Sequence, residues 1–535
     1  MLASRENLPL LAELLAEQQR LDTPVARFST AHESGALPTL ARRHEALIPL
    51  TKPQPGEQYA FEVDLDACTG CKSCVAACHS LNGLDETETW RDVGLVVGGN
   101  ARAPFTQTIT TACHHCADPA CLNGCPVLAY EKDPLTGIVR HLDDQCIGCS
   151  YCILKCPYDV PKFSERLGIV RKCDMCHGRL AEGEAPACAQ ACPTHAIRIV
   201  VAKSPTAERR SRIAQSEIRP PDSKISFLSC APDPGYTRPT TRYVTKRKLP
   251  ADLAAADAAA LRPQPPHWPL IVLLILMPMA VGCGIADKVL ALQTPAIAVL
   301  CWFAGATGLV FSVAHLGQPR RAWRIFLGLR RSWLSREAVV FGAWFVLATL
   351  YTLVRLGWLP PVAHPFRAAL ATATATLGVC GLFCSVMIYA DTRRAFWRFA
   401  HTAPRFFGSA LILGLASALT AAGAPSWLGF ALAAATAGKL LFEARALDPL
   451  NGDRDTITPA RQTALLLSGP LRPVNELRAA AALLGGVFLP LMLSLEMAPA
   501  IAAWPALALS LVGEFAERYL FFRAVDAPKM PGMPA

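Results

Sequence analysis

The chain has 535 residues, enough for two or three domains, and 52% of them are apolar while only 18% are charged. This composition excludes a disordered chain and is too apolar for an ordinary soluble enzyme. The formal charge of +10 does not indicate a nucleic-acid partner, because most basic residues flank apolar segments.

Residues 1–55 are predicted to form a polar, partly helical extension. Glu13 and Glu17 interrupt the apolar positions, so we expect no secretory signal here. The stretch Leu8–Gln19 has helical spacing instead. It is interpreted either as a surface helix packed on its own domain or as a docking helix for a partner subunit. Disulfides are not expected if the soluble part is never exported.

Residues 56–202 hold sixteen of the 21 cysteines, in four runs of four. The first run has the spacing C-x2-C-x2-C-x3-C of bacterial ferredoxins, and the other three runs end in Cys-Pro. His79 replaces the proline in the first run, which leaves the ligands intact. The runs are Cys68, Cys71, Cys74 and Cys78; Cys113, Cys116, Cys121 and Cys125; Cys146, Cys149, Cys152 and Cys156; and Cys173, Cys176, Cys188 and Cys192.

Such runs hold iron through three closely spaced thiolates, while the fourth leaves on a helix and ligates the other cluster of a pair. The pattern predicts an α+β ferredoxin-like domain with four [4Fe–4S] clusters in two pseudo-symmetric pairs. Structural zinc is the competing interpretation of paired C-x2-C motifs, but zinc sites rarely continue to a third cysteine and a Cys-Pro. Spacing alone does not decide which runs share a cluster. Cys230, Cys283, Cys301, Cys380 and Cys384 lie outside the pattern and are interpreted as packing residues.

Residues 203–266 contain ten prolines and twelve Lys or Arg, which predicts an extended, weakly structured, basic linker. From residue 267 to 535 the chain is apolar, and we predict an all-α bundle of eight membrane helices. Eight such runs in a soluble protein would leave little polar surface. The expected helices are 268–290, 295–314, 337–358, 367–390, 405–422, 426–445, 477–497 and 500–520.

Loop charge predicts the orientation of these helices. Alternate loops and the C-terminal tail hold 18 Lys and Arg against 2 in the opposite set. The positive-inside rule therefore places both ends of the anchor, and with them the cysteine domain, in the cytoplasm. We expect a multi-pass protein of the bacterial inner membrane.

Residues 59–202 resemble the four-cluster iron–sulfur subunit of the dimethyl sulfoxide reductase family, through "CTGCKSCVAAC", "CHHCADPACLNGCP", "CIGCSYCILKCP" and "KCDMC…CAQACP". The segment 312–345, "SVAHLGQPRRAWRIF…RSWLSREAVVFGAWF", resembles the haem-free, eight-helix membrane anchor of that family. The resemblance implies that two subunits are fused in this chain.

The resemblance also implies how the cysteines pair, since the family pairs its first run with the fourth and its second with the third. Four sets follow: set A (Cys68, Cys71, Cys74, Cys192), set B (Cys78, Cys173, Cys176, Cys188), set C (Cys113, Cys116, Cys121, Cys156) and set D (Cys125, Cys146, Cys149, Cys152).

A quinone site is expected at the cytoplasmic face of the anchor. No pair of predicted helices offers the facing histidines of a b-type haem, so no haem is expected. His315 ends the second predicted helix and Glu337 opens the third. The family resemblance makes both candidates for quinone proton exchange, close to the first cluster of the electron path. A helix cap and an interfacial acid are the alternative interpretation. Lys439 and Glu514 are further candidates, or a structural ion pair with Glu443 or Arg518.

The function that these patterns favour is electron transfer. By resemblance, the chain links membrane quinone through the clusters to a cytoplasmic molybdopterin catalytic subunit, either a reductase or a sulfite-type dehydrogenase. Quinone is then its own substrate, and the chain is otherwise a non-catalytic subunit held in lipid. Two alternatives are a structural part of a larger respiratory complex and a membrane-tethered redox sensor. The sequence contains no P-loop, dinucleotide fingerprint or hydrolytic motif that would suggest a self-contained enzyme.

Overall fold

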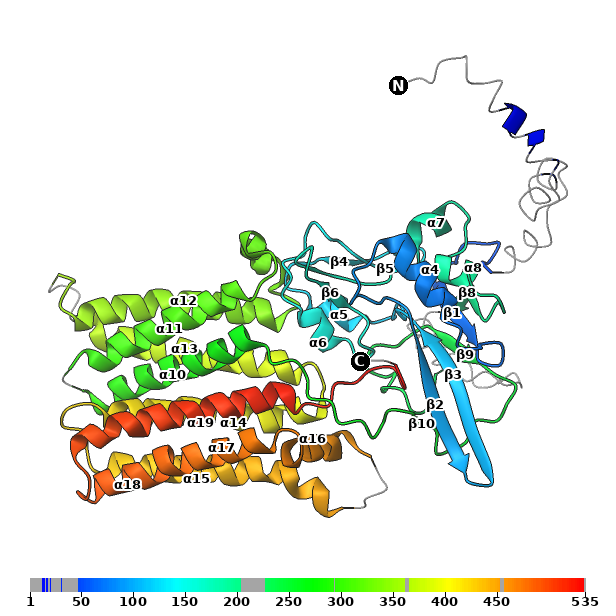
Figure 1. The fold of residues 1–535 in the computed structure, drawn as a ribbon. Helices are drawn as coiled ribbons and strands as arrows, with labels where there is room; N and C mark the ends of the chain where they lie inside the picture. The colour runs from blue at the N-terminus through cyan, green and yellow to red at the C-terminus, as the bar shows by residue number, and fades with distance from the viewer. Residues whose placement is uncertain are drawn as a thin grey trace, which may run out of the picture.

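The computed structural model describes residues 47–203, 227–292, 294–360, 365–452 and 457–533, and seven single positions before residue 47. Figure 1 shows two parts side by side: a mixed α and β part with the cysteine runs, and a bundle of long helices. The expected fold class, an α+β ferredoxin-like part followed by an all-α anchor, is confirmed.

A three-stranded sheet brings the two ends of the cysteine segment together. Strand β1 (Glu57–Asp64) pairs antiparallel with β8 (Ile197–Lys203), with Val63 opposite Ile197, and parallel with β9 (Arg242–Val244). β1 precedes the first cysteine run and β8 follows the fourth. The pairing therefore places these two runs next to each other.

A long hairpin forms a second sheet beside the first. Strand β2 (Asp92–Asn100) pairs antiparallel with β3 (Ala103–Thr111), and β10 (Ala254–Ala255) adds to the outer edge of β2. Two short hairpins follow the second and third cysteine runs. They are β4–β5 (Tyr130–Lys132 and Val139–His141) and β6–β7 (Lys162–Ser164 and Ile169–Arg171).

Short helices accompany the cysteine runs. They are α4 (Ser73–Asn82), α5 (Ala120–Gly124), α6 (Tyr151–Lys155), α7 (His177–Ala181) and α8 (Ala187–Gln190). The helix of the first run, α4, is ten residues long, whereas the other helices of this part have four or five residues. α4 contains Cys78, the last cysteine of the first run, whereas the last cysteines of the other runs follow just after the ends of α5, α6 and α8.

The expected linker differs from the structure over residues 227–266. Besides β9 and β10, this segment buries Leu228, Thr237 and Leu253 against the cysteine domain. Its prolines do not prevent this, since extended segments can pair at sheet edges and fill gaps without regular helices. Residues 204–226 lie outside the described residues.

Within its described residues the anchor contains eight helices that are long and apolar enough to cross a membrane, as expected. The seventh includes a π-helical turn, Leu483–Phe488, which joins α17 to α18. The spans are α10 (Trp268–Leu290), α11 (Ala296–Ala314), α12 (Trp333–Arg355), α13 (Arg367–Ala390), α14 (Phe399–Leu419), α15 (Trp427–Ala444), α17–α18 (Arg472–Ser494) and α19 (Ala503–Arg523).

Three spans begin earlier than their hydropathy predicts. Helices α12, α14 and α17 start at Trp333, Phe399 and Arg472 rather than at residues 337, 405 and 477. On α12, Ser335 donates a hydrogen bond to the carbonyl oxygen of Pro126 in the cysteine domain. The first turns of α14 and α17 are mostly exposed, and Arg472 pairs with Glu476 one turn further along its own helix. An additional short helix, α16 (Pro459–Ser468), and a 3-10 segment, η2 (Pro319–Gly328), lie in the loops.

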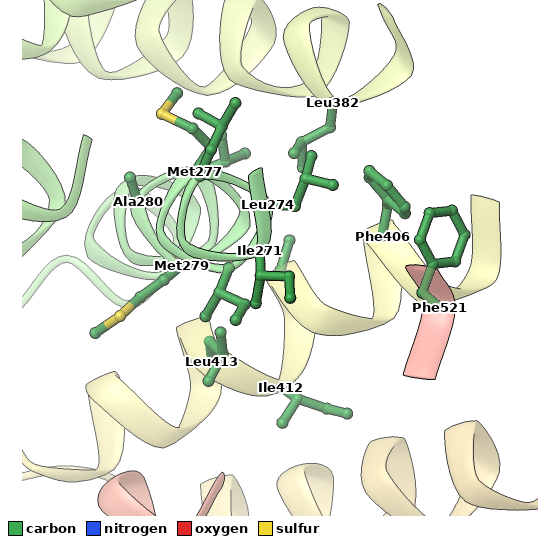
Figure 2. Close-up of a cluster of buried hydrophobic side chains, with 14 of the residues drawn as sticks. Ile271, Leu274, Met277, Met279, Ala280, Leu382, Phe406, Ile412, Leu413 and Phe521 are labelled. Carbon is green, nitrogen blue, oxygen red and sulfur yellow. The ribbon is translucent and has the colours of Figure 1, made fainter. Parts of the chain in front are cut away.

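Helix α10 is the centre of the bundle. Figure 2 shows its residues Ile271, Leu274 and Met277 surrounded by side chains of other helices, among them Leu382 and Phe406. The approach of α10 to α14 is close because glycines face each other. A Cβ on Gly282 would lie 2.0 Å from the Ala410 carbonyl oxygen, so only glycine fits at this crossing.

The C-terminal tail returns to the cysteine domain after α19 (red in Figure 1). Met530 and Met533 are buried in the core of that domain, and Lys529 Nζ lies 2.6 Å from Asp257 Oδ2. At the other end of the chain, Leu47 is buried and its carbonyl accepts a hydrogen bond from Ile199 N. Of the expected Leu8–Gln19 helix, only residues 12–14 and 16–17 are described, and they are helical.

Candidate electron-transfer site

Main-chain amides surround the first thiol of three runs. The amide two residues after the cysteine donates to its Sγ: His115 N to Cys113 at 3.5 Å, Gly148 N to Cys146 at 3.3 Å, and Met175 N to Cys173 at 3.4 Å. Left-handed backbone at nearby positions aims these amides inward; His115, for example, has φ 40° and Gly148 φ 69°. Loops of this kind stabilise negative charge on sulfur.

The last cysteine of these same three runs, which all end in Cys-Pro, begins a repeated turn. Proline follows it, and the residue three positions on has positive φ: Leu128, Asp159 and His195, at 56°, 54° and 54°. The next amide then points back, as in Ala129 N to Cys125 Sγ (3.2 Å) and Ala196 N to Cys192 Sγ (3.3 Å). The sequence Cys-Pro therefore encodes both the helix end and a hydrogen bond to the thiol.

The first run reaches the same result differently. With His79 in place of proline, α4 continues for another turn to Asn82. Asn82 lies four residues after Cys78, and its side-chain Nδ2 lies 3.6 Å from Cys78 Sγ. A side-chain amide thus occupies the position that a main-chain amide has in the other runs.

The thiols of different runs meet around two pockets. One pocket is lined by Cys113, Cys116 and Cys121 of the second run together with Cys156 of the third. The other is lined by Cys68, Cys71 and Cys74 of the first run together with Cys192 of the fourth. These groupings coincide with sets C and A.

The remaining thiols form two further groups. Burial raises the pKa of Cys152, and the neighbouring thiols of Cys149, Cys146 and Cys125 raise it further, which groups the members of set D. Burial raises the pKa of Cys78 to about 12, with contributions from Cys188 and Cys176 of set B. Among the described residues no three His, Cys, Asp or Glu are close enough to hold a single metal ion. The thiols of sets C and A are thus arranged around pockets rather than converging on a point.

Three buried side chains, Tyr130, Lys172 and Arg91, each lie between two cysteine sets, and together they show which sets are neighbours. Burial and then the thiols of Cys152 (set D), Cys121 (set C) and Cys125 raise the pKa of Tyr130. Although burial lowers the pKa of Lys172, the thiols of set C, with Cys173 of set B, raise it overall.

The series ends at the surface of the cysteine domain. Arg91 faces Cys188 of set B and Cys74 of set A, and Cys71 of set A is exposed. The sequence of neighbours is therefore D, C, B, A, with set A at the surface.

Set D is the one that touches the membrane helices. Its loop meets the segment between α11 and α12 backbone to backbone: a Cβ on Gly148 would lie 2.9 Å from the Gly317 Cα. Gln318 N donates to Ile147 O (3.0 Å), and Arg321 donates to the carbonyl oxygen of Cys146 (3.2 Å). The arginine-rich loops of the anchor thus lie on the side of the cysteine domain.

A large cavity, about 1010 Å³, opens where the two parts meet. Gly148 and Ser150, which flank Cys149 of set D, form part of its wall, and so does His315. The volume is in the range of sites for small organic ligands. Its wall includes apolar rings as well as polar groups, for example Trp397 and Phe522.

His315 is placed as the sequence predicts, at the C-terminal end of α11 and in the cavity wall. Its Nδ1 is buried and has no hydrogen-bond partner among the described residues. Burial lowers its pKa, so the ring is neutral near neutral pH. A neutral imidazole with a free nitrogen can accept or donate a proton at this position.

Glu337 is not brought together with His315. It is buried on α12, accepts a hydrogen bond from Ser385 Oγ of α13, and is absent from the cavity wall. Both residues were expected at one quinone site; the structure places His315 in the cavity wall and Glu337 within α12, four residues after its start at Trp333. Glu337 therefore lies one turn inside the bundle.

Lys439 and Glu514 form a buried ion pair with each other rather than lining the cavity. Arg478 also contacts Glu514, at 3.1 Å, and Lys439 lies 3.6 Å from Glu443. This network joins α15, α17 and α19 inside the bundle. Of the alternatives posed by the sequence, it fits a structural ion pair that includes Glu443.

Several residues of the site were not found by sequence reasoning. His267, Arg394 and Asp526 also line the cavity, and burial raises the pKa of Asp526 to about 6. Arg91 and Lys172 lie buried between the sets. The only available signal was a basic residue next to a cysteine, as in Lys172–Cys173, since Asp526 reaches the site through the long-range return of the tail.

Buried thiols grouped in fours within a ferredoxin-like domain, docked on eight apolar helices, define a membrane-anchored iron–sulfur electron-transfer protein. Comparison with known families agrees: residues 105–202 match a 4Fe-4S dicluster domain, and residues 265–523 match the DMSO reductase anchor subunit.

Individual relatives resemble the cysteine domain. The B subunit of anaerobic dimethyl sulfoxide reductase from Haemophilus influenzae is 39% identical over 150 residues, which are 26% of the present sequence and 73% of the relative. The B subunit from Escherichia coli is 38% identical over 148 residues, 26% of the present sequence and 72% of the relative. The formate dehydrogenase-O iron-sulfur subunit of Escherichia coli is 32% identical over 180 residues, 30% and 60% of the two sequences. The protein belongs to the family of iron–sulfur subunits that includes the B subunit of dimethyl sulfoxide reductase, and it carries the anchor domain in the same polypeptide.

Proposed function

We propose that this protein conducts electrons between membrane quinone and a molybdopterin catalytic subunit through four [4Fe–4S] clusters, one in each of the four cysteine sets. The catalytic partner is a reductase or a sulfite-type dehydrogenase. The relatives named above support the catalytic partner. The arrangement of the four cysteine sets in this protein supports the electron path.

The residues present fit iron–sulfur clusters. Sets C and A each line a pocket with four thiols, and main-chain amides point at sulfur in three of the four runs. Burial raises the pKa of most of these thiols, for example Cys125 to about 11 and Cys78 to about 12. Such thiols become thiolates only beside a strong positive charge, which iron supplies. When bound, the clusters supply one-electron transfer.

The observation that carries the proposal is the order D, C, B, A. Set D adjoins both the membrane helices and the large cavity, whereas Cys71 of set A is exposed on the cysteine domain. A series of four neighbouring sites that begins at the membrane and ends at the surface supports a conductor between two reaction centres. A redox sensor would not need a series of four sites that extends from the membrane to the protein surface.

The cavity supports quinone as the membrane reactant. Its rings can contact an aromatic head group, and Gly148 and Ser150 place that group next to set D. Quinone reactions move protons together with electrons, and neutral His315 can exchange one of them. Because His315 and the cysteine domain lie on one side of the bundle, protons and electrons would use the same compartment.

Loop charge supports the cytoplasm as that compartment. Arg321 and Arg324 of the basic loop donate hydrogen bonds to main-chain carbonyls of the cysteine domain. The positive-inside rule assigns such loops to the cytoplasm, in a bacterial inner membrane.

The test is quinol-dependent reduction of the clusters. Anaerobically purified protein should contain about sixteen irons and sixteen sulfides per molecule, at four of each per cluster. Membranes that contain the protein should then show cluster signals in electron paramagnetic resonance on addition of a quinol analogue. Stoichiometric zinc with little iron would overturn the cofactor, and full cluster content without quinol reduction would overturn the quinone link.

A further inference from the structure

Arg91 is a buried arginine without a carboxylate partner. It precedes β2 and is 2% exposed. No acidic side chain in the described part of the protein forms an ion pair with it, and its Nε and one terminal nitrogen have no hydrogen-bond partner there. The guanidinium lies over the Phe61 ring, with 4.6 Å to the centroid. An isolated buried charge is costly, so some other negative group must compensate it.

The groups that face Arg91 are cysteine thiols of two different sets. The Phe61 ring under Arg91 belongs to one buried cluster with Cys74, Cys173 and Cys188. Burial opposes the charge, but these thiols and that of Cys78 raise the pKa of Arg91 above its ordinary value. Cys74 belongs to set A, and the other three belong to set B. Arg91 therefore lies at the boundary between the two sets that are farthest from the membrane helices.

A hydroxyl connects Arg91 to set A specifically. Arg91 donates to Thr110 Oγ1 at 3.3 Å, and the same oxygen lies 3.5 Å from Cys74 Sγ. Thr110 stands on β3, which pairs with β2, so the hairpin itself fixes the arrangement. Set B has no such bridging hydroxyl in these contacts and faces the guanidinium without an intermediary.

Resting on the proposed function, we propose that Arg91 is a counter-charge shared by the clusters of sets A and B, which raises the reduction potentials of both. Reduction adds one negative charge to a cluster, and a fixed positive charge beside it stabilises the reduced form. Net charge and hydrogen bonds to sulfur are known determinants of cluster potential. The absence of a carboxylate partner leaves the full charge of Arg91 available to the clusters.

The experiment is a redox titration of the full-length, anaerobically purified protein, followed by electron paramagnetic resonance. In Arg91→Met, two of the four midpoint potentials should shift to more negative values, and two should stay. Arg91→Lys keeps the charge and should leave all four close to the parental values. Thr110→Val removes the bridge, together with the hydrogen bond that Thr110 Oγ1 donates to the Asp92 carbonyl oxygen, and should lower one midpoint, that of set A. The signal altered in Cys71→Ser identifies that cluster.

Several outcomes would contradict the proposal. If Arg91→Met shifts none of the four midpoints, or all four equally, Arg91 is not a counter-charge specific to sets A and B. If Arg91→Met does not assemble clusters, Thr110→Val must still lower one midpoint, and unchanged potentials there overturn the bridge. Iron and sulfide content, measured on the same samples, reports separately on the proposed function. Full iron and sulfide content with unchanged midpoint potentials would reject the role of Arg91 and leave the proposed function intact.

Discussion

His315 and Glu337 differ in their relation to the cavity, and this difference is testable. His315 lines the cavity, and its Nδ1 has no hydrogen-bond partner among the described residues, whereas Glu337 is buried in the bundle, absent from the cavity wall and hydrogen-bonded to Ser385. We expect His315→Gln to slow cluster reduction by quinol analogues by about 10²–10⁴-fold, the usual cost of losing an acid–base group. Glu337→Gln should slow it less. Stopped-flow absorbance of the clusters measures both rates.

The two variants should keep the parental iron content, which serves as the control. Equal parental rates in both would place quinone elsewhere. A larger loss in Glu337→Gln than in His315→Gln would mean that the cavity is not where the head group reacts.

Residue-scale prediction from sequence succeeded where the chemistry is local. Cysteine spacing predicts a loop whose main-chain amides point at the thiols, because donor and acceptor lie within a few residues of each other, as Gly148 N and Cys146 Sγ do. Arg91 and Asp526 could not be predicted, because nothing near them in sequence marks the partners that the fold supplies. Whether His315 and Glu337 meet depended on where α12 begins, and hydropathy does not determine that boundary.

At the scale of elements, glycine controls how closely α10 approaches α14. A Cβ on Gly282 would lie 2.0 Å from the Ala410 carbonyl oxygen, a main-chain atom that cannot move alone. We expect Gly282→Ala to destabilise the bundle by about 1–3 kcal/mol, as overpacking does. The apparent melting temperature of the purified protein in detergent should fall.

Gly342 on α12 provides the matched control, because a Cβ there meets nothing within 4 Å. Gly342→Ala should leave the melting temperature at or above the parental value, since alanine favours helix. Similar losses in both variants would show that the crossing is not the cause.

The elements were predicted with uneven success for physical reasons. Eight spans followed from hydropathy, because each needs about 20 apolar residues to cross the hydrocarbon. Residues 227–266 were expected to be weakly structured, yet β9 and β10 complete two sheets. Their proline content describes local preference, whereas their edge pairing depends on strands more than 150 residues away, as between Ala254 and Val97.

At the scale of the whole molecule, the C-terminal tail fastens the anchor to the cysteine domain. Met530 and Met533 are buried in that domain's core. Burying a methionine side chain contributes about 1.5–3 kcal/mol. Removal of residues 525–535 should therefore lower the melting temperature and make the cysteine domain more sensitive to protease. Lys529→Ala loses a partly exposed ion pair with Asp257 and a hydrogen bond to the Met533 carbonyl oxygen but keeps both methionines buried, so it should have a smaller effect. Unchanged protease sensitivity after truncation would show that the tail is dispensable.

The orientation in the membrane can be tested with reporter fusions. The proposed topology predicts that fusions after residue 292 or 424 report the outer side and fusions at residue 325 the cytoplasm. The reversed pattern would move the cysteine domain, and with it the catalytic partner, to the outside.

Covalent continuity between the two parts changes how the contact at Gly148 and Gly317 must be judged. Two separate subunits need a large apolar interface to associate at cellular concentrations. Here docking is intramolecular, with an effective concentration that short connections bring to the order of millimolar. A few main-chain contacts can then suffice, even if they would not hold two separate subunits together. The cysteine domain and the anchor are also always made in a one-to-one ratio. A weakened contact would lower the fraction of molecules in which the cysteine domain is docked on the anchor. It would not cause a subunit to dissociate.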